Sequence, residues 1–299
     1  MKLVPPFFSA CFLLILSLLA GAANAAAAAK EMVIGLIPET NIFQQMERYK
    51  PLGKYLSEQT GTNIKFSVLT RYGNLIENFQ QHHLDGAFFG SFTGALAIQK
   101  LGIIPIARPV NLNGKSTYSG LIFVRKDSGI KSVDDMRGKR FAFVEKATSA
   151  GYIFPLAYLH DHGVKNVNSF LGETYFTGSH DASMYAVLQG KAGVGAAKDS
   201  VYEWIASRDP TIDKELRVLA RSEEFPSNGL GLRKDMDPAL VSKLKTILLH
   251  LHESPQGLKV LETLRARRFI ETRVEDYKPV FDAARHAGID ISTYVFQNE

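Results

Sequence analysis

The chain has 299 residues, of which 45% are hydrophobic and 22% are charged, and its formal net charge is +5. These values are ordinary for a globular protein, and the length allows one large domain or two smaller ones. No basic block with interleaved aromatic residues occurs, so nucleic acid is not expected as a partner.

Residues 1–25 have the pattern of a cleaved secretory signal peptide rather than of a membrane anchor. They begin with Lys2, continue through an apolar run too short for a comfortable transmembrane span, and end in Ala-Asn-Ala. The only cysteine, Cys11, lies in this segment, so the mature chain has no disulfide. A secreted protein of this size without cysteine indicates the bacterial periplasm. Removal of the segment leaves 34 Lys and Arg against 30 Asp and Glu, a modest positive field that suits anionic ligands.

The first part of the mature chain alternates strand and helix patterns. Buried strands are expected for 32–37, 63–69, 85–90, 103–110 and 118–126, and helices for 43–60 and 72–83. Gly61 ends the first helix, and the small-residue turn "GSFTGALA" starts another after the strand at 85–90.

The pattern then restarts. Strands are expected for 140–144, 168–176, 192–197, 215–222 and 228–236, and helices from Thr148 and over 179–190. Asp237-Pro238 is a good helix start, and the remainder is expected to be mainly helical, with "RARR" at 265–268 on a helix surface. The sequence therefore predicts an α/β fold of two units. The expected boundaries are 26–122 for the first lobe, 123–228 for the second, and 229–299 for a return to the first.

The stretch "VEKATSAGY" places small residues and two hydroxyls between a strand ending at Val144 and a helix beginning near Thr148. The first N–H groups of a helix have no intrahelical partner, so an anion can approach them closely where side chains are small. Thr148 and Ser149 would add hydroxyl donors. A phosphate, phosphonate or sulfate group suits such a junction, although Ser and Thr also serve as ordinary helix caps. The Gly-Lys-Ser/Thr ending of a P-loop is missing, so nucleotide hydrolysis has no support.

Two further strand-to-helix junctions carry polar side chains. Ser91 and Thr93 lie in "FFGSFTGALA", and His180 precedes a helix in "GSHDASMYAV". An imidazole pairs with an oxyanion when cationic and still donates one hydrogen bond when neutral. Because crevices in open α/β sheets collect ligands at the carboxyl ends of strands, we expect these junctions to face one ligand.

The sequence contains no convincing pattern of a catalytic or metal-binding site. The sequence has no Gly-x-Ser-x-Gly elbow and no cysteine nucleophile in the mature chain. His82-His83 and the "HDH" at 160–162 lack a convincing third metal ligand and are interpreted as exposed helix ends. We expect neither an enzyme nor a cofactor or metal.

Five segments of the chain are familiar as a set: "GLIPETN", "YKPLGKYLSEQTG", "LDGAFFGSFTGALA", "YSGLIFVRKDSGIKSVDDMRGKRFAFVEKATSAG" and "GSHDASMYAVLQGKAGVGAAKDSVYE". Together they span roughly residues 33–235, and they resemble the periplasmic phosphonate-binding proteins of ABC transporters, within the wider phosphate/phosphite/phosphonate family. The resemblance implies a two-lobed type II binding-protein fold that closes on its ligand about a hinge. It assigns phosphonate oxygens to Thr148, Ser149 and backbone N–H groups near Ala150, and further contacts to His180 and Asp199.

The chain departs from the family pattern at two places. Ala147 stands where the family has a serine, and Ala150 is inserted before Gly151, so one hydroxyl is missing. Gly94 takes a position that is commonly aromatic, which either widens the pocket or leaves Tyr118 or Phe92 to close it.

The leading hypothesis is therefore a monomeric periplasmic protein that binds a small anionic ligand, such as phosphonate, phosphite or phosphate, and delivers it to an ABC permease in the inner membrane. A sensor that signals to a membrane receptor kinase would have the same fold and pocket. An enzyme acting on a phosphorus or carboxylate ester would need a base beside a nucleophile, or a metal, and neither is found.

Overall fold

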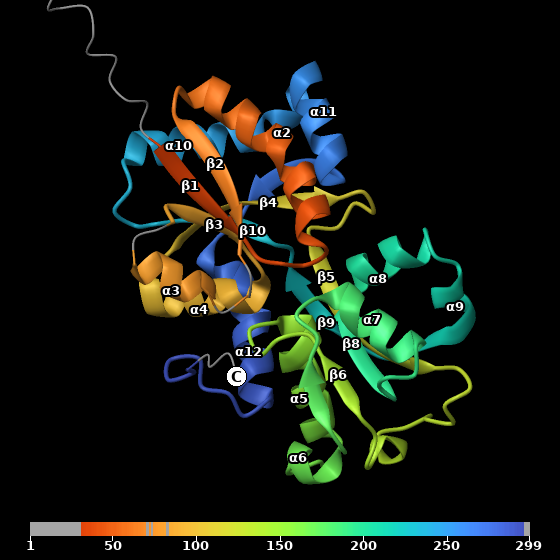
Figure 1. Cartoon of the computed structure of the whole chain (residues 1–299). Helices are drawn as coiled ribbons and strands as arrows, with labels where there is room; N and C mark the ends of the chain where they lie inside the picture. Colours follow the sequence, from red (N-terminus) through yellow and green to blue (C-terminus); the bar gives the residue numbers. More distant parts are fainter. Residues whose placement is uncertain (1–30, 70–71, 73, 82–83, 296–299) are drawn as a thin grey trace, which may run out of the picture.

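The computed structural model describes residues 31–69, 72, 74–81 and 84–295, and its elements form two α/β lobes (Figure 1). Residues 1–25, predicted as a signal peptide, and His82-His83 lie outside the described residues. Each lobe contains one mixed sheet covered by helices. The two-lobed α/β prediction is thus confirmed.

The first lobe is built on a sheet with the order β11-β4-β10-β3-β1-β2. Its strands are β1 (Glu31–Leu36), β2 (Asn63–Val68), β3 (Gly86–Phe89), β4 (Ile104–Asn111), β10 (Gly229–Leu232) and β11 (Ala266–Glu271). Strands β2, β1 and β3 are parallel, whereas β10 is antiparallel to both of its neighbours. The helices of this lobe are α2 (Ile42–Thr60), α3 (Asn74–Gln80), α4 (Ser91–Leu101), α10 (Pro238–Leu249), η3 (Leu251–Glu253) and α11 (Pro255–Leu264).

The second lobe has a sheet with the order β7-β6-β8-β5-β9. Its strands are β5 (Thr117–Arg125), β6 (Phe141–Phe143), β7 (Thr174–Phe176), β8 (Val194–Lys198) and β9 (Leu216–Pro226). Its helices are η1 (Asp134–Met136), η2 (Ser149–Ile153), α5 (Phe154–Asp161), α6 (Val167–Phe170), α7 (His180–Leu188), α8 (Asp199–Ala206) and α9 (Thr211–Glu215).

The chain passes between the lobes twice through short segments that lie side by side. The first connects β4 to β5, and the second connects β9 to β10. Ser227 N donates to Ser116 O at 2.9 Å, and Asn111 Nδ2 donates to Ser227 Oγ at 3.2 Å. Because β5 belongs to the second sheet from its first residue, the expected lobe boundary at 122/123 falls within this strand.

The last described segment joins both lobes. It contains η4 (Val274–Tyr277) and α12 (Lys278–His286), and α12 packs on α5 of the second lobe and on α4 of the first (Figure 1). One buried apolar cluster consequently runs from Phe92 in α4 through Val280 in α12 to Phe154 in α5. This core, together with the crossing segments, holds the junction side chains of the two lobes together.

Two secondary-structure predictions were wrong. Within 168–176, expected as one strand, the first residues belong to the short helix α6, which Asn166 caps by accepting from Ser169 N. Residues 265–268 do not lie on a helix surface, because Arg265 ends α11 and β11 begins at Ala266. Apolar and polar residues alternate poorly along β11, which carries two arginines. Because β11 is an edge strand that pairs only with β4, exposed charges are tolerated there.

Candidate ligand site between the lobes

The junction after β6 forms a helix start with free amides. Thr148 precedes the π-helical turn η2, and the first hydrogen bond into this turn runs from Ile153 N to Thr148 O at 3.1 Å. The amides of residues 149–152 therefore have no intrahelical carbonyl to bind. A Cβ at Gly151 would lie 2.4 Å from Val144 Cβ, so only glycine allows the turn to fold back on the strand. The small residues at this junction thus create a compact group of N–H donors.

The two hydroxyls of this junction differ in their environment. Thr148 Oγ1 donates to Glu145 O at 2.6 Å, which stabilises the loop itself. Ser149 Oγ is buried and makes no hydrogen bond of good geometry to a described residue. It lies close enough to Tyr118 to lower that phenol's pKa, against the larger effect of burial, which raises it. Ser149 is therefore the hydroxyl that remains available to a ligand.

The hydroxyl groups of Ser91 and Tyr118 meet although the two residues belong to different lobes. Ser91 begins α4, Tyr118 lies in β5, and their hydroxyl oxygens are 2.6 Å apart. Ser91 Oγ also donates to Pro226 O at 2.9 Å. Thr93 lies two residues further on, where its hydroxyl donates to Gly90 O at 3.0 Å, and it does not line the cavity that Ser91 and Tyr118 share.

His180 supplies a neutral imidazole. Its Nδ1 accepts from Lys198 N at 3.3 Å, so the ring proton is on Nε2 in the neutral tautomer that this bond requires. Burial lowers the pKa of His180 to about 4, with Lys198 acting in the same direction and Glu39 opposing. Of the two roles considered for this histidine, the structure favours the neutral donor over the cation.

The cation of the site comes from a residue that the sequence analysis did not single out. Lys198, the last residue of β8, is buried, and its Nζ lies 2.8 Å from Glu39 Oε1 and 3.1 Å from Asn228 Oδ1. Glu39 follows β1 in the other lobe and is also 3.7 Å from Arg48. Burial alone would raise the pKa of Glu39, but Lys198 and Arg48 lower it to about 2, so the pair is ionised. It joins the two lobes directly beside the junction amides.

We call the small cavity enclosed by these groups the cradle. It is lined by Ile37, Glu39, Tyr72, Gly90, Ser91, Tyr118, Ala147, Thr148, Ser149, Ala150, His180, Lys198 and Asn228. The cradle unites six of the eight residues expected at the site, and Thr93 and Asp199 lie outside it. Its volume of about 10 Å³ is room for roughly one water molecule, so a larger oxyanion enters only when the lobes separate.

Asp199 begins α8, one residue beyond the cradle lysine. Its carboxylate accepts from Ser119 N at 3.0 Å and from Arg221 at 2.9 Å. Both partners lie in the second lobe, so these two hydrogen bonds of Asp199 join β5 and β9 to the start of α8.

At Gly94, where the chain departs from the family pattern, the adjacent space is filled by a residue from a distant part of the sequence. A Cβ at Gly94 would lie 2.6 Å from Cε1 of Tyr277, so the Tyr277 ring occupies the space next to this glycine. Phe92 packs edge-on against Tyr294, with ring centroids 5.4 Å apart, and does not line the cradle. Of the alternatives considered, Tyr118 is the aromatic residue that closes the cavity.

In the part of the chain that the structure describes, no group of three His, Cys, Asp or Glu side chains is placed to hold a metal ion. The "HDH" segment ends α5 with exposed side chains, as predicted, and His162 Nδ1 lies 2.7 Å from Tyr158 O.

This arrangement agrees with the comparison to known families. Residues 34–277 match the model for the periplasmic substrate-binding protein of phosphonate ABC transporters. The chain belongs to this phosphonate-binding family. Its relatives are substrate-binding proteins of transport systems, and family members are periplasmic.

Individual relatives are distant but extend over most of the chain. The probable ABC transporter phosphite-binding protein of Prochlorococcus marinus is 26% identical over 266 residues, covering 86% of this chain and 89% of the relative. The phosphate-import protein of Mycolicibacterium smegmatis is 26% identical over 230 residues, covering 72% and 70%. A crystal structure of the P. marinus protein with methylphosphonate has a TM-score of 0.78 at 22% identity, covering 87% and 99%.

The relatives distinguish between the transport and the receptor-kinase hypotheses. Each is described as a transport component, so the alternative of a partner for a receptor kinase finds no support. Over the described residues, no helix has the length and apolar character needed to cross a bilayer.

Proposed function

We propose that the protein is the periplasmic binding component of an ABC importer and that the cradle holds a phosphorus oxyanion, with phosphonate and phosphite as the leading ligands. The observation that carries the proposal is the Ser149 hydroxyl, buried without a well-formed hydrogen bond beside the free amides of residues 149–152. A buried hydroxyl that is incompletely hydrogen-bonded costs up to about 1–3 kcal/mol, and an oxyanion would reduce this cost.

The charges of the site suit an anion. Lys198 and Arg48 are two cations that share the single carboxylate Glu39, so this group carries a net positive charge. Ser149, the amides and the neutral His180 supply hydrogen-bond donors that need no counter-charge of their own. An oxyanion accepts from all of them, whereas a neutral ligand would leave the excess charge uncompensated.

The remaining assignments follow from this function. Residues 1–25 direct export, the mature protein is a monomer in the periplasm, and its macromolecular partner is the permease in the inner membrane. The protein performs no chemistry on its ligand. Ligand entry requires the lobes to separate about the two crossing segments, and closure on the ligand presents the form that the permease recognises.

The test is a thermal-shift panel on residues 26–299 with phosphate, phosphite, methylphosphonate, 2-aminoethylphosphonate, sulfate and small carboxylates. A ligand at a hundred times its dissociation constant should stabilise the protein by about 2.7 kcal/mol. We expect a phosphorus oxyanion to give the largest shift, and the Ser149→Ala variant to lose it. A shift with carboxylates alone, or no shift with any phosphorus compound, would reject the proposal.

A further inference from the structure

A second, larger cavity adjoins the cradle. We call it the basin; its volume is about 350 Å³, and it is lined by residues of both lobes and of both crossing segments. Glu39, Lys198 and Asn228 line the basin and the cradle alike, so these three side chains form the partition between them. A ligand held in the cradle would therefore direct any substituent that passes this partition into the basin.

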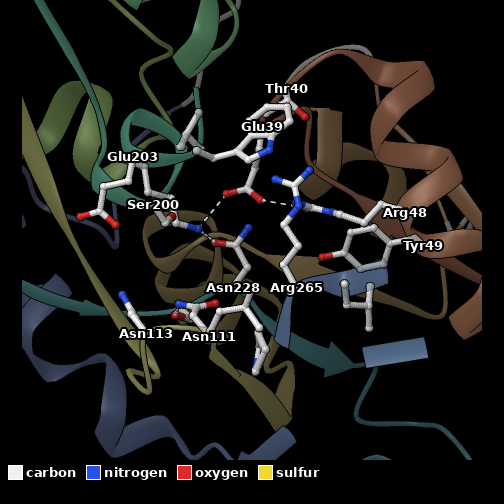
Figure 2. A pocket seen from close by; sticks show the side chains of 17 residues that line it. Glu39, Thr40, Arg48, Tyr49, Asn111, Asn113, Ser200, Glu203, Asn228 and Arg265 are labelled. Carbon is white, nitrogen blue, oxygen red and sulfur yellow. Dashed lines mark hydrogen bonds and ion pairs between the residues drawn. The ribbon is translucent and has the colours of Figure 1, made fainter. Parts of the chain in front are cut away.

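The far side of the basin is positively charged. Figure 2 shows the guanidinium groups of Arg48 and Arg265 extending toward one another near Glu39. Glu39 is already shared between Lys198 and Arg48, and Arg265 forms no ion pair with a described residue. Burial, together with the nearby charges of Arg48 and Arg208, lowers the pKa of Arg265 to about 10. The basin thus has more cationic than anionic charge at this point.

Arg265 is held in a costly backbone conformation. It ends helix α11 with φ 56° and ψ 41°, and among the described residues it is the only non-glycine residue with positive φ. Glycine is the usual residue at such a helix end, because a side chain there costs about 1 kcal/mol. Since a glycine would terminate the helix with less strain, the arginine side chain itself needs an explanation.

Aromatic packing fixes the direction of this side chain. The Arg265 guanidinium lies 4.2 Å from the centroid of Trp204 in α8, and Arg208 lies 4.8 Å from the same ring. Trp204 belongs to the second lobe and Arg265 to the first, so this contact spans the cleft. The stacked guanidinium keeps its N–H edges available, because stacking uses only its face.

We propose that the basin binds a second anionic group of the transported ligand, so that the preferred ligand is a phosphonate bearing a carboxylate or another phosphoryl group. This inference rests on the proposed function, since the phosphonate end would occupy the cradle. The guanidinium groups of Arg48 and Arg265 bind the second group, and Asn111, Asn113 and Ser200 add polar contacts around it. Glu203 lies on the other side of the basin in Figure 2, where its exposed carboxylate forms no ion pair with Arg48 or Arg265.

The test compares three ligands by calorimetric titration of residues 26–299. Methylphosphonate has no second charge, 3-phosphonopropionate has an anionic end, and 2-aminoethylphosphonate has a cationic end. We expect 3-phosphonopropionate to bind at least about tenfold more tightly than 2-aminoethylphosphonate, because charge-assisted hydrogen bonds favour the former. This ranking tests the inference on the unaltered protein.

Substitutions then assign the preference to Arg265. Arg265→Asn removes the charge, and asparagine tolerates the left-handed conformation, so the fold should persist. We expect about a tenfold loss of affinity for 3-phosphonopropionate and little change for methylphosphonate. Lys259→Asn, an exposed residue on the same helix α11, makes the same charge change away from the basin and should alter neither affinity.

The outcomes separate this inference from the proposed function. If methylphosphonate binds but the three ligands rank without regard to the second charge, the basin inference is wrong and the cradle stands. Equal effects of Arg265→Asn and Lys259→Asn on 3-phosphonopropionate would also overturn it. If none of the three phosphonates binds, the basin inference fails, and the thermal-shift panel with phosphite and phosphate decides whether the cradle proposal stands.

Discussion

Lys198 and Glu39 are 2.8 Å apart although one ends a strand of the second lobe and the other follows a strand of the first. Both side chains are nearly inaccessible to water, at 9% and 10% exposure. An ion pair of this kind must break when the cleft opens, and each charge then regains water. The pair therefore links the position of the lobes to the occupancy of the cradle.

The Glu39→Gln substitution should favour the open form in the absence of ligand. It leaves Lys198 buried without its main counter-charge, a change that costs about 3–5 kcal/mol when no relaxation is available. Opening of the cleft relieves this cost, and an anion in the cradle replaces the lost charge. Small-angle scattering should therefore show a larger radius of gyration that returns to the compact value when ligand is added. Glu47→Gln in the following helix α2, where the side chain is 74% exposed, is the control. An unchanged radius in Glu39→Gln would contradict this role.

Ser149→Ala and Thr148→Ala should have opposite profiles. The Ser149 hydroxyl lacks a well-formed hydrogen bond in the closed protein, so its loss should leave the melting temperature nearly unchanged. Its loss should weaken oxyanion binding by about 10- to 100-fold, because hydrogen bonds to charged groups contribute about 1.5–3 kcal/mol. Thr148→Ala removes the bond to Glu145 O and should cost about 1 kcal/mol of stability. Thermal unfolding and titration calorimetry on both variants decide this, and a reversed pattern would reject the assignment of the two hydroxyls.

His180 should make stability depend on pH in the acid range. Its folded-state pKa of about 4 lies below the ordinary histidine value of 6.5, chiefly because of burial, so the unfolded chain binds a proton at higher pH than the folded protein. Stability is then full above pH 6.5 and falls by up to about 3 kcal/mol as pH drops toward 4. Denaturant unfolding at several pH values should show a flatter profile between 6.5 and 4 for His180→Asn. His160→Asn, at an exposed site, should retain the original slope, and equal slopes in both variants would count against this cause.

Gly94 and Tyr277 should be energetically coupled. A methyl group at Gly94 would meet the Tyr277 ring at 2.6 Å, so Gly94→Ala should destabilise the protein by about 1–3 kcal/mol. Tyr277→Ala removes the obstructing ring, so the double variant should lose less stability than the two single variants together. A double-mutant cycle by urea unfolding measures this difference, which is about 0.5–3 kcal/mol for residues in contact. Additive changes in the free energy of unfolding would mean that the Tyr277 ring moves away from the added methyl group at no energetic cost.

Sequence patterns predicted the alternation of strands and helices and the junctions that meet at the cradle. The reason is physical: hydrophobic periodicity marks buried strands, and ligand-facing residues follow the carboxyl ends of strands. Ser91, Ser149 and His180 were accessible to this reasoning because each begins a helix directly after a strand or a short loop.

Contacts between the lobes could not be predicted in this way. Lys198 and Glu39 resemble solvated surface charges when each is considered in its own segment, and only tertiary packing brings them together. One signal was present for Lys198, which directly follows the apolar run "VGAA" at the carboxyl end of a strand. The position of Arg265 depended on strand β11, whose charged residues and weak alternation hid it, and on a left-handed backbone that no local pattern requires.

The insertion of β10 between β3 and β4 also determines the order in which the lobes can be completed. All strands of the second sheet lie between Thr117 and Pro226, which are direct partners in β5 and β9. The first sheet, in contrast, lacks the strand between β3 and β4 until Gly229–Leu232 joins it, after the entire second lobe. Since long-range strand pairing is the slow step in forming a sheet, the lobe that comes second in the chain can finish folding before the lobe that comes first. Until then the unpaired edges of β3 and β4 are exposed, so the first lobe is the part of the folding chain most prone to aggregate.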